Sequence, residues 1–154
     1  MNWKENRIEA ALNGVNPTVI IRMKSGFAVM GDTQFLPGYC VLLGYPAVNS
    51  LNDINIERRS EFLVDMSILG DALIDVCKPM RINYEILGNT DAFLHAHLFP
   101  RYIWEEENRK KLPVFQYPKE NWSKEEYQYN IEKHGLLKSQ LAEKLKELML
   151  RTYK

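Results

Sequence analysis

The chain has 154 residues, of which 45% are apolar and 26% are charged, as in an ordinary soluble globular protein. This length supports one domain with a full hydrophobic core over residues 1–154, and it is short for two domains. Twenty Lys and Arg residues balance twenty Asp and Glu residues, and the absence of a basic field argues against binding to a nucleic-acid polymer.

The N-terminus and the cysteines bear on the cellular compartment. Residues 1–5 include charged side chains, and no long apolar run follows them. We therefore expect neither a secretory signal nor a membrane span. Cys40 and Cys77 do not have the spacing of a metal site or of a disulfide framework. These observations predict a cytoplasmic protein with no membrane partner.

Four short elements are predicted in the first part of the chain. Residues 3–12 favour a short helix with apolar side chains on one side. Strands over 19–23 and 27–30 follow, joined by a glycine-containing turn. The continuous apolar run over 39–43 is typical of a central strand.

The clearest predicted helix spans about residues 56–78. Pro79 stops it, and either Asp53 or Asn55 is placed to cap its first turn. Apolar side chains recur along this helix at alternating spacings of four and three residues, so they form one stripe that faces the core. The stripe consists of Phe62, Met66, Leu69, Leu73 and Val76.

Two strands are expected after this helix. Residues 82–87 alternate strongly, and residues 93–99 supply the next strand, which Pro100 is expected to end. The two strands would pair as a hairpin around the loop 88–92. This pairing places the loop beside the side chains at the start of the second strand.

The C-terminal part differs in character. Residues 105–111 are a charge run, expected to be solvated, and residues 112–122 form an aromatic loop that covers another part of the molecule. Ser123 and Glu126 have the spacing of a capping box, from which a helix with Leu137, Leu141, Leu145 and Leu148 on one face would start. The pattern predicts an α+β domain, with an antiparallel sheet and a long helix on one side.

His95 and His97 lie one residue apart in the second strand of the expected hairpin. Side chains alternate between the faces of a strand, so both imidazoles point to the same side, with their Cα atoms about 6.6 Å apart. Leu94, Ala96 and Leu98 would then face the core. Imidazole changes its charge near neutral pH, and two imidazoles aimed at one spot suit nucleophilic or proton-transfer chemistry.

Two neighbouring features indicate phosphate chemistry. The turn Gly88-Asn89-Thr90-Asp91 offers backbone N–H groups to an anion, and Arg101 places a permanent cation near the same edge. Such a group of residues would stabilise charge on a phosphoryl centre. The alternative is that both histidines are structural, because His-x-His also occurs in strands by chance.

The segment Phe93-Leu94-His95-Ala96-His97-Leu98-Phe99-Pro100-Arg101 resembles the signature of the histidine triad family of nucleotide hydrolases and transferases. That signature has three histidines alternating with apolar residues, then two apolar residues and often Pro-Arg. Residues 35–42 are similar to the family's Pro-Gly-His segment, and the resemblance covers roughly residues 25–102. It implies a HIT-like fold with a core over about residues 18–102 and a C-terminal extension over about 103–154.

The register of the motif implies the role of each histidine. Counting back from the Pro-Arg pair, His97 is the third histidine of the signature, His95 is the second, and Phe93 occupies the first position. The second histidine is the family's nucleophile, so the resemblance implies that His95 attacks the α-phosphate of a nucleotide and forms a nucleotidyl-histidine. His97 would bond a phosphate oxygen and assist the leaving group. The other register puts Phe99 third and breaks the spacing to the Pro-Arg pair.

The resemblance also implies substrate contacts. Asn89 and Thr90 would hold phosphate oxygens, and the turn around Asp32 would approach the ribose. Phe93 and Arg101 are further candidate substrate-binding residues, because they flank the two histidines. No metal ligand and no cofactor is implied.

Two functions remain open at this point. The first is a hydrolase or nucleotidyltransferase that acts on a small nucleotide conjugate, such as a dinucleoside polyphosphate or a nucleoside phosphoramidate. The second is a catalytically weak nucleotide-binding or sensor protein, which the loss of the first histidine at Phe93 favours. Tyr39 also departs from the family, since it stands where Pro-Gly-His is usual. A metal site of His95 and His97 with His134 or a carboxylate is a weaker third interpretation, because His134 sits in a charged segment.

The resemblance further implies a homodimer, because histidine triad proteins commonly pair through a strand edge and the main helix. An antiparallel sheet leaves edge strands that must be covered or paired. The run Val41-Leu42-Leu43 carries no charge that would discourage such pairing, and the alternative is that this run is simply a central strand. The aromatic segment 113–122 could then reach the partner's site or fold over its own.

Overall fold

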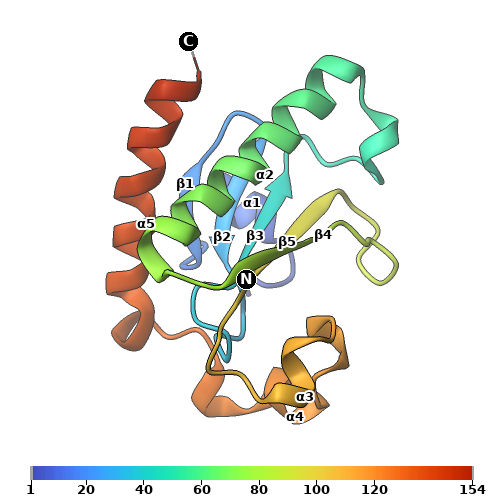
Figure 1. The fold of residues 1–154 in the computed structure, drawn as a ribbon. Helices are drawn as coiled ribbons and strands as arrows, with labels where there is room; N and C mark the ends of the chain where they lie inside the picture. The colour runs from blue at the N-terminus through green and yellow to red at the C-terminus, as the bar shows by residue number, and fades with distance from the viewer. Residues whose placement is uncertain (1, 154) are drawn as a thin grey trace.

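The computed structural model describes residues 2–153 and contains a five-stranded antiparallel sheet in the order β1-β2-β3-β5-β4 (Figure 1). Two long helices, α2 and α5, lie side by side and pack on the sheet. The predicted α+β class is therefore confirmed. In chain order the elements are α1 (Arg7–Leu12), β1 (Val19–Arg22), β2 (Gly26–Met30), β3 (Cys40–Gly44), a 3-10 turn (Leu51–Asp53), α2 (Ile56–Cys77), β4 (Arg81–Glu85), β5 (His95–Arg101), α3 (Glu107–Lys110), a 3-10 turn (Val114–Gln116), α4 (Lys119–Ser123), a 3-10 turn (Glu125–Tyr127) and α5 (Ile131–Thr152).

Helix α2 forms as its sequence predicts. The Asn55 side chain caps its start by accepting a hydrogen bond from the Arg58 N–H at 2.9 Å. Lys78 ends the helix in the left-handed conformation, with φ of 53°, just before Pro79. Of the predicted apolar stripe, Phe62, Leu69 and Leu73 are fully buried, and Met66 and Val76 pack against them at the margin.

The hairpin of β4 and β5 is confirmed, but β5 starts and ends two residues later than expected. Pro100 does not end the strand, since it pairs with Ile82 and the pairing continues to Arg101. Strand β3 pairs with β5 only as far as Leu98, so Pro100 lies where β5 has a single neighbour, and a proline is tolerated there.

Strand β3 is central, with β2 on one side and β5 on the other. The prediction of a central strand over residues 39–43 is therefore confirmed, and Val41-Leu42-Leu43 is not available to pair with a second chain, because the backbone groups of β3 are already paired within the sheet. The two edges of the sheet are β1 and β4.

The main core lies between one face of the sheet and the helices α2 and α5. Leu94, Ala96 and Leu98 are buried in this core, as their alternation predicts, together with Leu141 and Leu145 of α5. The histidines between them therefore point to the opposite face of the sheet. Among residues 2–153, no helix is both long and apolar enough to span a membrane.

Helix α5 starts later than the capping box predicted. Ser123 ends α4, and Asn130 caps α5 by accepting hydrogen bonds from the N–H groups of its first turn. The reason is long-range pairing, because the Tyr127 carbonyl accepts a hydrogen bond from the Gln34 N–H and the Tyr129 N–H donates to the Asp32 carbonyl. These bonds, with the bridge between Thr33 and Gln128, hold the backbone extended at Gln128 and Asn130, where the local pattern favours a helix. Helix α1 also starts later than expected, at Arg7.

A buried ion pair anchors the segment that follows β5. The side chains of Arg101 and Glu105 are almost completely buried and lie 3.0 Å apart. Glu105 also accepts hydrogen bonds from the Tyr102 N–H at 2.7 Å and from the Tyr117 hydroxyl at 2.6 Å. Burial raises the pKa of Glu105, but these hydrogen bonds and the Arg101 cation outweigh it, so the pKa lies below its usual value. The expectation that residues 105–111 are all solvated is therefore wrong at Glu105.

We expect Glu105→Gln to lower the free energy of unfolding by about 3 kcal/mol, because it leaves the buried Arg101 cation without its counter-charge. Denaturant unfolding measures this change. The matched control is Glu143→Gln on α5, where the exposed pair Glu143–Lys146 should contribute less than about 1 kcal/mol. Equal effects of the two substitutions would contradict the assignment.

Candidate functional site

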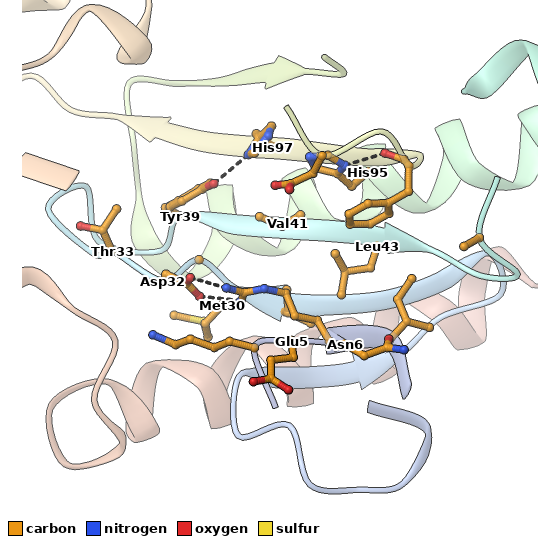
Figure 2. A pocket seen from close by; sticks show the side chains of 18 of the residues that line it. Glu5, Asn6, Met30, Asp32, Thr33, Tyr39, Val41, Leu43, His95 and His97 are labelled. Atoms are coloured by element: carbon orange, nitrogen blue, oxygen red, sulfur yellow. Dashed lines mark hydrogen bonds and ion pairs between the residues drawn. The ribbon is translucent and has the colours of Figure 1, made fainter. Parts of the chain in front are cut away.

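A cavity of about 660 Å³ lies on the face of the sheet that carries the two histidines (Figure 2). The sheet forms its floor, the N-terminal segment forms one wall, and aromatic residues from the C-terminal part form another. Its volume is in the range of small-molecule sites. The residues that line it include Lys4, Glu5, Asn6, Arg7, Asp32, Tyr39, Val41, Leu43, Asp91, Phe93, His95, His97, Phe115 and Trp122.

His95 is held by the backbone of the residue two positions before it. Its Nδ1 lies 2.7 Å from the carbonyl oxygen of Phe93 (Figure 2). A carbonyl oxygen only accepts hydrogen bonds, so Nδ1 carries the proton and donates it. In the neutral ring, Nε2 is then the nitrogen with the free electron pair. The Phe93 ring stacks on the imidazole with 4.5 Å between centroids, which fixes the ring further.

His97 is oriented by a tyrosine on the neighbouring strand segment. The Tyr39 hydroxyl lies 2.7 Å from His97 Nδ1 (Figure 2). Burial, together with a smaller effect of the nearby His95, lowers the pKa of His97 to about 4, and Asp91 opposes the shift. At neutral pH, the free protein therefore holds His97 as the neutral ring. The two imidazoles meet edge to face, with 4.9 Å between their centroids.

Tyr39 is a site residue to which the sequence alone assigned no role. Burial raises the pKa of its hydroxyl, so the group keeps its proton and can donate it to His97. The ring is clamped between Phe99, at a centroid distance of 4.3 Å, and Gly31, where an added Cβ would come within 2.2 Å of it. The one available signal was its position just before β3, the strand that pairs with the histidine strand.

Asp32 lies at the cavity, as predicted, but it has a partner that the sequence did not reveal. Arg7 donates from Nη1 to Oδ1 at 2.8 Å and from Nη2 to Oδ2 at 2.6 Å. This bidentate geometry is the strong form of the Arg–carboxylate contact. The hydrogen bonds that Arg7 donates to Asp32 raise the pKa of Arg7 above its ordinary value, and the guanidinium also lies over the ring of Trp3 at 5.1 Å.

The loop 88–92 reaches the cavity through a different residue than predicted. Asn89 and Thr90 are exposed and do not line the cavity, whereas Asp91 does. The Asp91 carbonyl accepts a hydrogen bond from the Phe93 N–H at 2.8 Å, which ties the loop to the start of β5. The expected donors to phosphate oxygens are therefore not at the cavity in this structure.

Arg101 is not brought to the cavity either. All five of its N–H groups are used inside the protein, since they donate to the Glu105 carboxylate, to the Asn83 side chain and to the carbonyls of Arg109 and Leu112. The predicted contact of Arg101 with substrate is therefore corrected to a structural role. The physical reason is that Arg101 lies at the far end of β5, beyond Phe99, where the C-terminal segment surrounds its guanidinium.

The weaker metal interpretation gains no support from the geometry. His134 lies on α5, where its Nδ1 accepts a hydrogen bond from the Asn130 N–H at 2.9 Å, and it does not line the cavity. Within residues 2–153, no group of three or more His, Cys, Asp or Glu side chains is placed to hold a metal ion.

The aromatic loop predicted over residues 112–122 does cover another part of the molecule. Phe115 and Trp122 line the cavity and stack on each other with 5.1 Å between centroids. The Phe115 ring meets His97 edge to face at 5.5 Å. On the side of His97 that faces the C-terminal segment, the wall of the cavity is therefore apolar and aromatic.

Solved structures of histidine triad proteins share this fold. A histidine triad protein from Marinobacter aquaeolei VT8 is 19% identical, with a TM-score of 0.68 over 84% of this chain and 89% of that chain. A hypothetical histidine triad nucleotide-binding protein from Sulfolobus tokodaii strain 7 is 12% identical, with a TM-score of 0.68 over 92% of this chain and 91% of that chain. Diadenosine triphosphate hydrolase from Plasmodium falciparum is 17% identical, with a TM-score of 0.57 over 84% of this chain and 77% of that chain.

No protein-family model matches the chain, and no curated protein matches it. At these identities the structural likeness establishes the fold. The chain therefore has the histidine triad fold, as the motif around its two histidines implies.

We expect His97 in the free protein to titrate with a pKa of about 4 and, above that pH, to carry its proton on Nε2. The reason is that the Tyr39 hydroxyl donates to Nδ1 and so stabilises this neutral form. Nitrogen NMR of the ring measures both quantities. Tyr39→Phe should raise the pKa and allow the Nδ1–H form to appear, while the His134 signals stay unchanged. A wild-type His97 ring protonated on Nδ1 would contradict the assignment.

Proposed function

We propose that this chain, which has the histidine triad fold, is a nucleotide hydrolase or nucleotidyltransferase that acts on the α-phosphate of a small nucleotide conjugate. The observation that carries the proposal is the hydrogen bond from His95 Nδ1 to the Phe93 carbonyl. It fixes Nε2 as the ring nitrogen with a free electron pair, in a side chain that lines a cavity large enough for a nucleotide. A nucleotide ligand is also supported by the fold shared with a diadenosine triphosphate hydrolase.

In the proposed first step, His95 Nε2 attacks the α-phosphorus and forms a P–N bond. The bond from phosphorus to the leaving group breaks, and the leaving atom keeps the electron pair and takes a proton from His97. His97 must be protonated for this step, and the negative phosphate of the bound substrate favours that form by raising its pKa. In the second step, neutral His97 takes a proton from water or another acceptor, which attacks phosphorus and frees His95.

The absence of a histidine at position 93 favours the alternative of a catalytically weak nucleotide-binding protein. The geometry argues for the enzyme instead, because the backbone carbonyl of Phe93, and not its side chain, orients His95. Any residue at position 93 supplies that carbonyl. The second ring, His97, takes its orientation from Tyr39, so both imidazoles are positioned without a third one.

We expect His95→Ala to lower turnover by several orders of magnitude, because it removes the nucleophile. Steady-state rates with dinucleoside polyphosphates and nucleoside phosphoramidates measure this loss. Intact-mass measurement after a rapid quench should detect one nucleotidyl group on the wild-type protein and none on the variant. The matched control is His134→Ala on α5, which should retain wild-type turnover. Turnover by His95→Ala close to that of the wild type would refute the assignment.

We also propose that two copies of the chain pair through β4. This strand has a single neighbour in the sheet, β5, and an unpaired edge favours pairing with a second chain. Tyr84 on the strand and Ile86 and Leu87 just after it are exposed, as are Leu63 and Ile74 of α2. Pairing would bury these exposed apolar side chains against a second copy of the chain, and this supports the proposal.

Light scattering at micromolar concentration should give twice the mass of one chain. Leu87→Lys should shift the mass toward that of a monomer, because it places a charge in the proposed interface. Leu150→Lys, at an exposed position near the end of α5, should leave the mass unchanged. A wild-type protein with the mass of one chain would overturn the proposal.

A further inference from the structure

The charges around the cavity are unevenly placed with respect to the two histidines. The cations that line it, Lys4 and Arg7, both come from the N-terminal segment. Arg7 is paired with Asp32 through two hydrogen bonds, so most of its charge is compensated locally. The ammonium of Lys4 lies over the ring of Trp3 at 5.5 Å, and the exposed carboxylate of Glu5 adjoins it in the chain.

Asp91 is the charged group of the loop that leads into the histidine strand. Its side chain lines the same cavity as His95 and His97, and it makes no ion pair with any residue from 2 to 153. Its charge acts on both sides of the cavity, since it opposes the lowering of the His97 pKa and contributes to the raised pKa of Arg7. The hydrogen bond from the Phe93 N–H to the Asp91 carbonyl fixes the backbone of this residue near His95.

The other groups near His97 supply no positive charge to oppose Asp91. Phe115 meets its ring edge to face, and Trp122 stacks behind Phe115. Arg101, which the sequence placed here, is buried against Glu105. A leaving group that departs past His97 therefore meets an aromatic wall and a carboxylate.

We propose that Asp91 is a specificity-determining residue that selects nucleotide conjugates whose leaving group carries a positive charge. The inference rests on the proposed function, and it deepens it by naming the substrate class. A polyphosphate leaving group would bring several negative charges beside Asp91, in a site with no free cation on that side. An amine leaving group with a second, protonated amine would instead place its ammonium near the carboxylate.

The reaction of such a conjugate balances with the groups already described. His95 Nε2 forms a bond to phosphorus, and the P–N bond of the phosphoramidate breaks. The leaving nitrogen keeps the electron pair and takes the proton from His97, so it departs as a neutral amine at that end. The distal ammonium stays protonated throughout and interacts with Asp91 without taking part in the chemistry.

Three matched substrates test the proposal. They are nucleoside 5′-phosphoramidates of one alkyl chain length that end in an ammonium, a hydroxyl or a carboxylate. For the wild-type protein we expect kcat/KM to fall in that order, by about tenfold for each unit of charge. Asp91→Asn should bring the ratio of ammonium to carboxylate substrate close to one, and Asp91→Lys should invert it. Glu5→Gln, which removes a carboxylate from the N-terminal wall of the same cavity, should keep the wild-type order.

A binding experiment separates this inference from the proposed function. Calorimetry on His95→Asn, which lacks the nucleophile, gives the Kd of each of the three conjugates without turnover, and the same order is expected. No wild-type turnover of any conjugate, with the order of Kd retained, would refute the hydrolase and keep the role of Asp91. Equal Kd and kcat/KM for all three, or a wild-type preference for the carboxylate conjugate or for a dinucleoside polyphosphate, would overturn the role of Asp91.

Discussion

The shape of the cavity depends on the burial of one cation. A guanidinium keeps its charge at any accessible pH, so Arg101 is stable at the end of β5 only if the chain returns to surround it. The segment after the sheet does so, because Glu105, the carbonyls of Arg109 and Leu112, and Tyr117 all converge on this ion pair. Phe115 and Trp122 are thereby carried to the cavity and close one side of it. A side chain that never touches the cavity thus determines one of its walls.

The two histidines are positioned by groups of different kinds. A backbone carbonyl orients His95, and that contact follows from the local course of the chain at the start of β5. A side chain from a different part of the chain, Tyr39, orients His97. The first contact is insensitive to which residue occupies position 93, whereas the second depends entirely on the hydroxyl. The presence of Phe93 in place of the first histidine of the signature is therefore compatible with the nucleophilic role proposed for His95.

Local patterns predicted the parts of the fold that local forces determine. The apolar stripe of α2 and the alternation of apolar side chains along β5 each predict which face of the element is buried, and the structure agrees with both predictions. Contacts between distant residues were not predictable in this way. Arg7 and Asp32 lie 25 positions apart, and nothing near either residue indicates the other. Glu105 lies in a charge run, which is a pattern that predicts a solvated side chain. Because the sequence does not reveal that Arg101 pairs with Glu105, it favours a contact between Arg101 and a phosphate group. The start of α5 is not predictable for the same reason, because the hydrogen bonds that delay the helix join Tyr127 and Tyr129 to Gln34 and Asp32.

The cavity has a floor formed by paired strands and walls formed by segments outside the sheet. His95, Val41 and Leu43 belong to paired strands, whereas the walls come from residues 4–8 and from Phe115 and Trp122. Replacing a wall residue changes no strand pairing, whereas replacing a floor residue disturbs the sheet itself. The residues that would select a ligand can therefore vary independently of the sheet, and the arrangement of the two imidazoles can stay the same while the ligand that the walls accept changes.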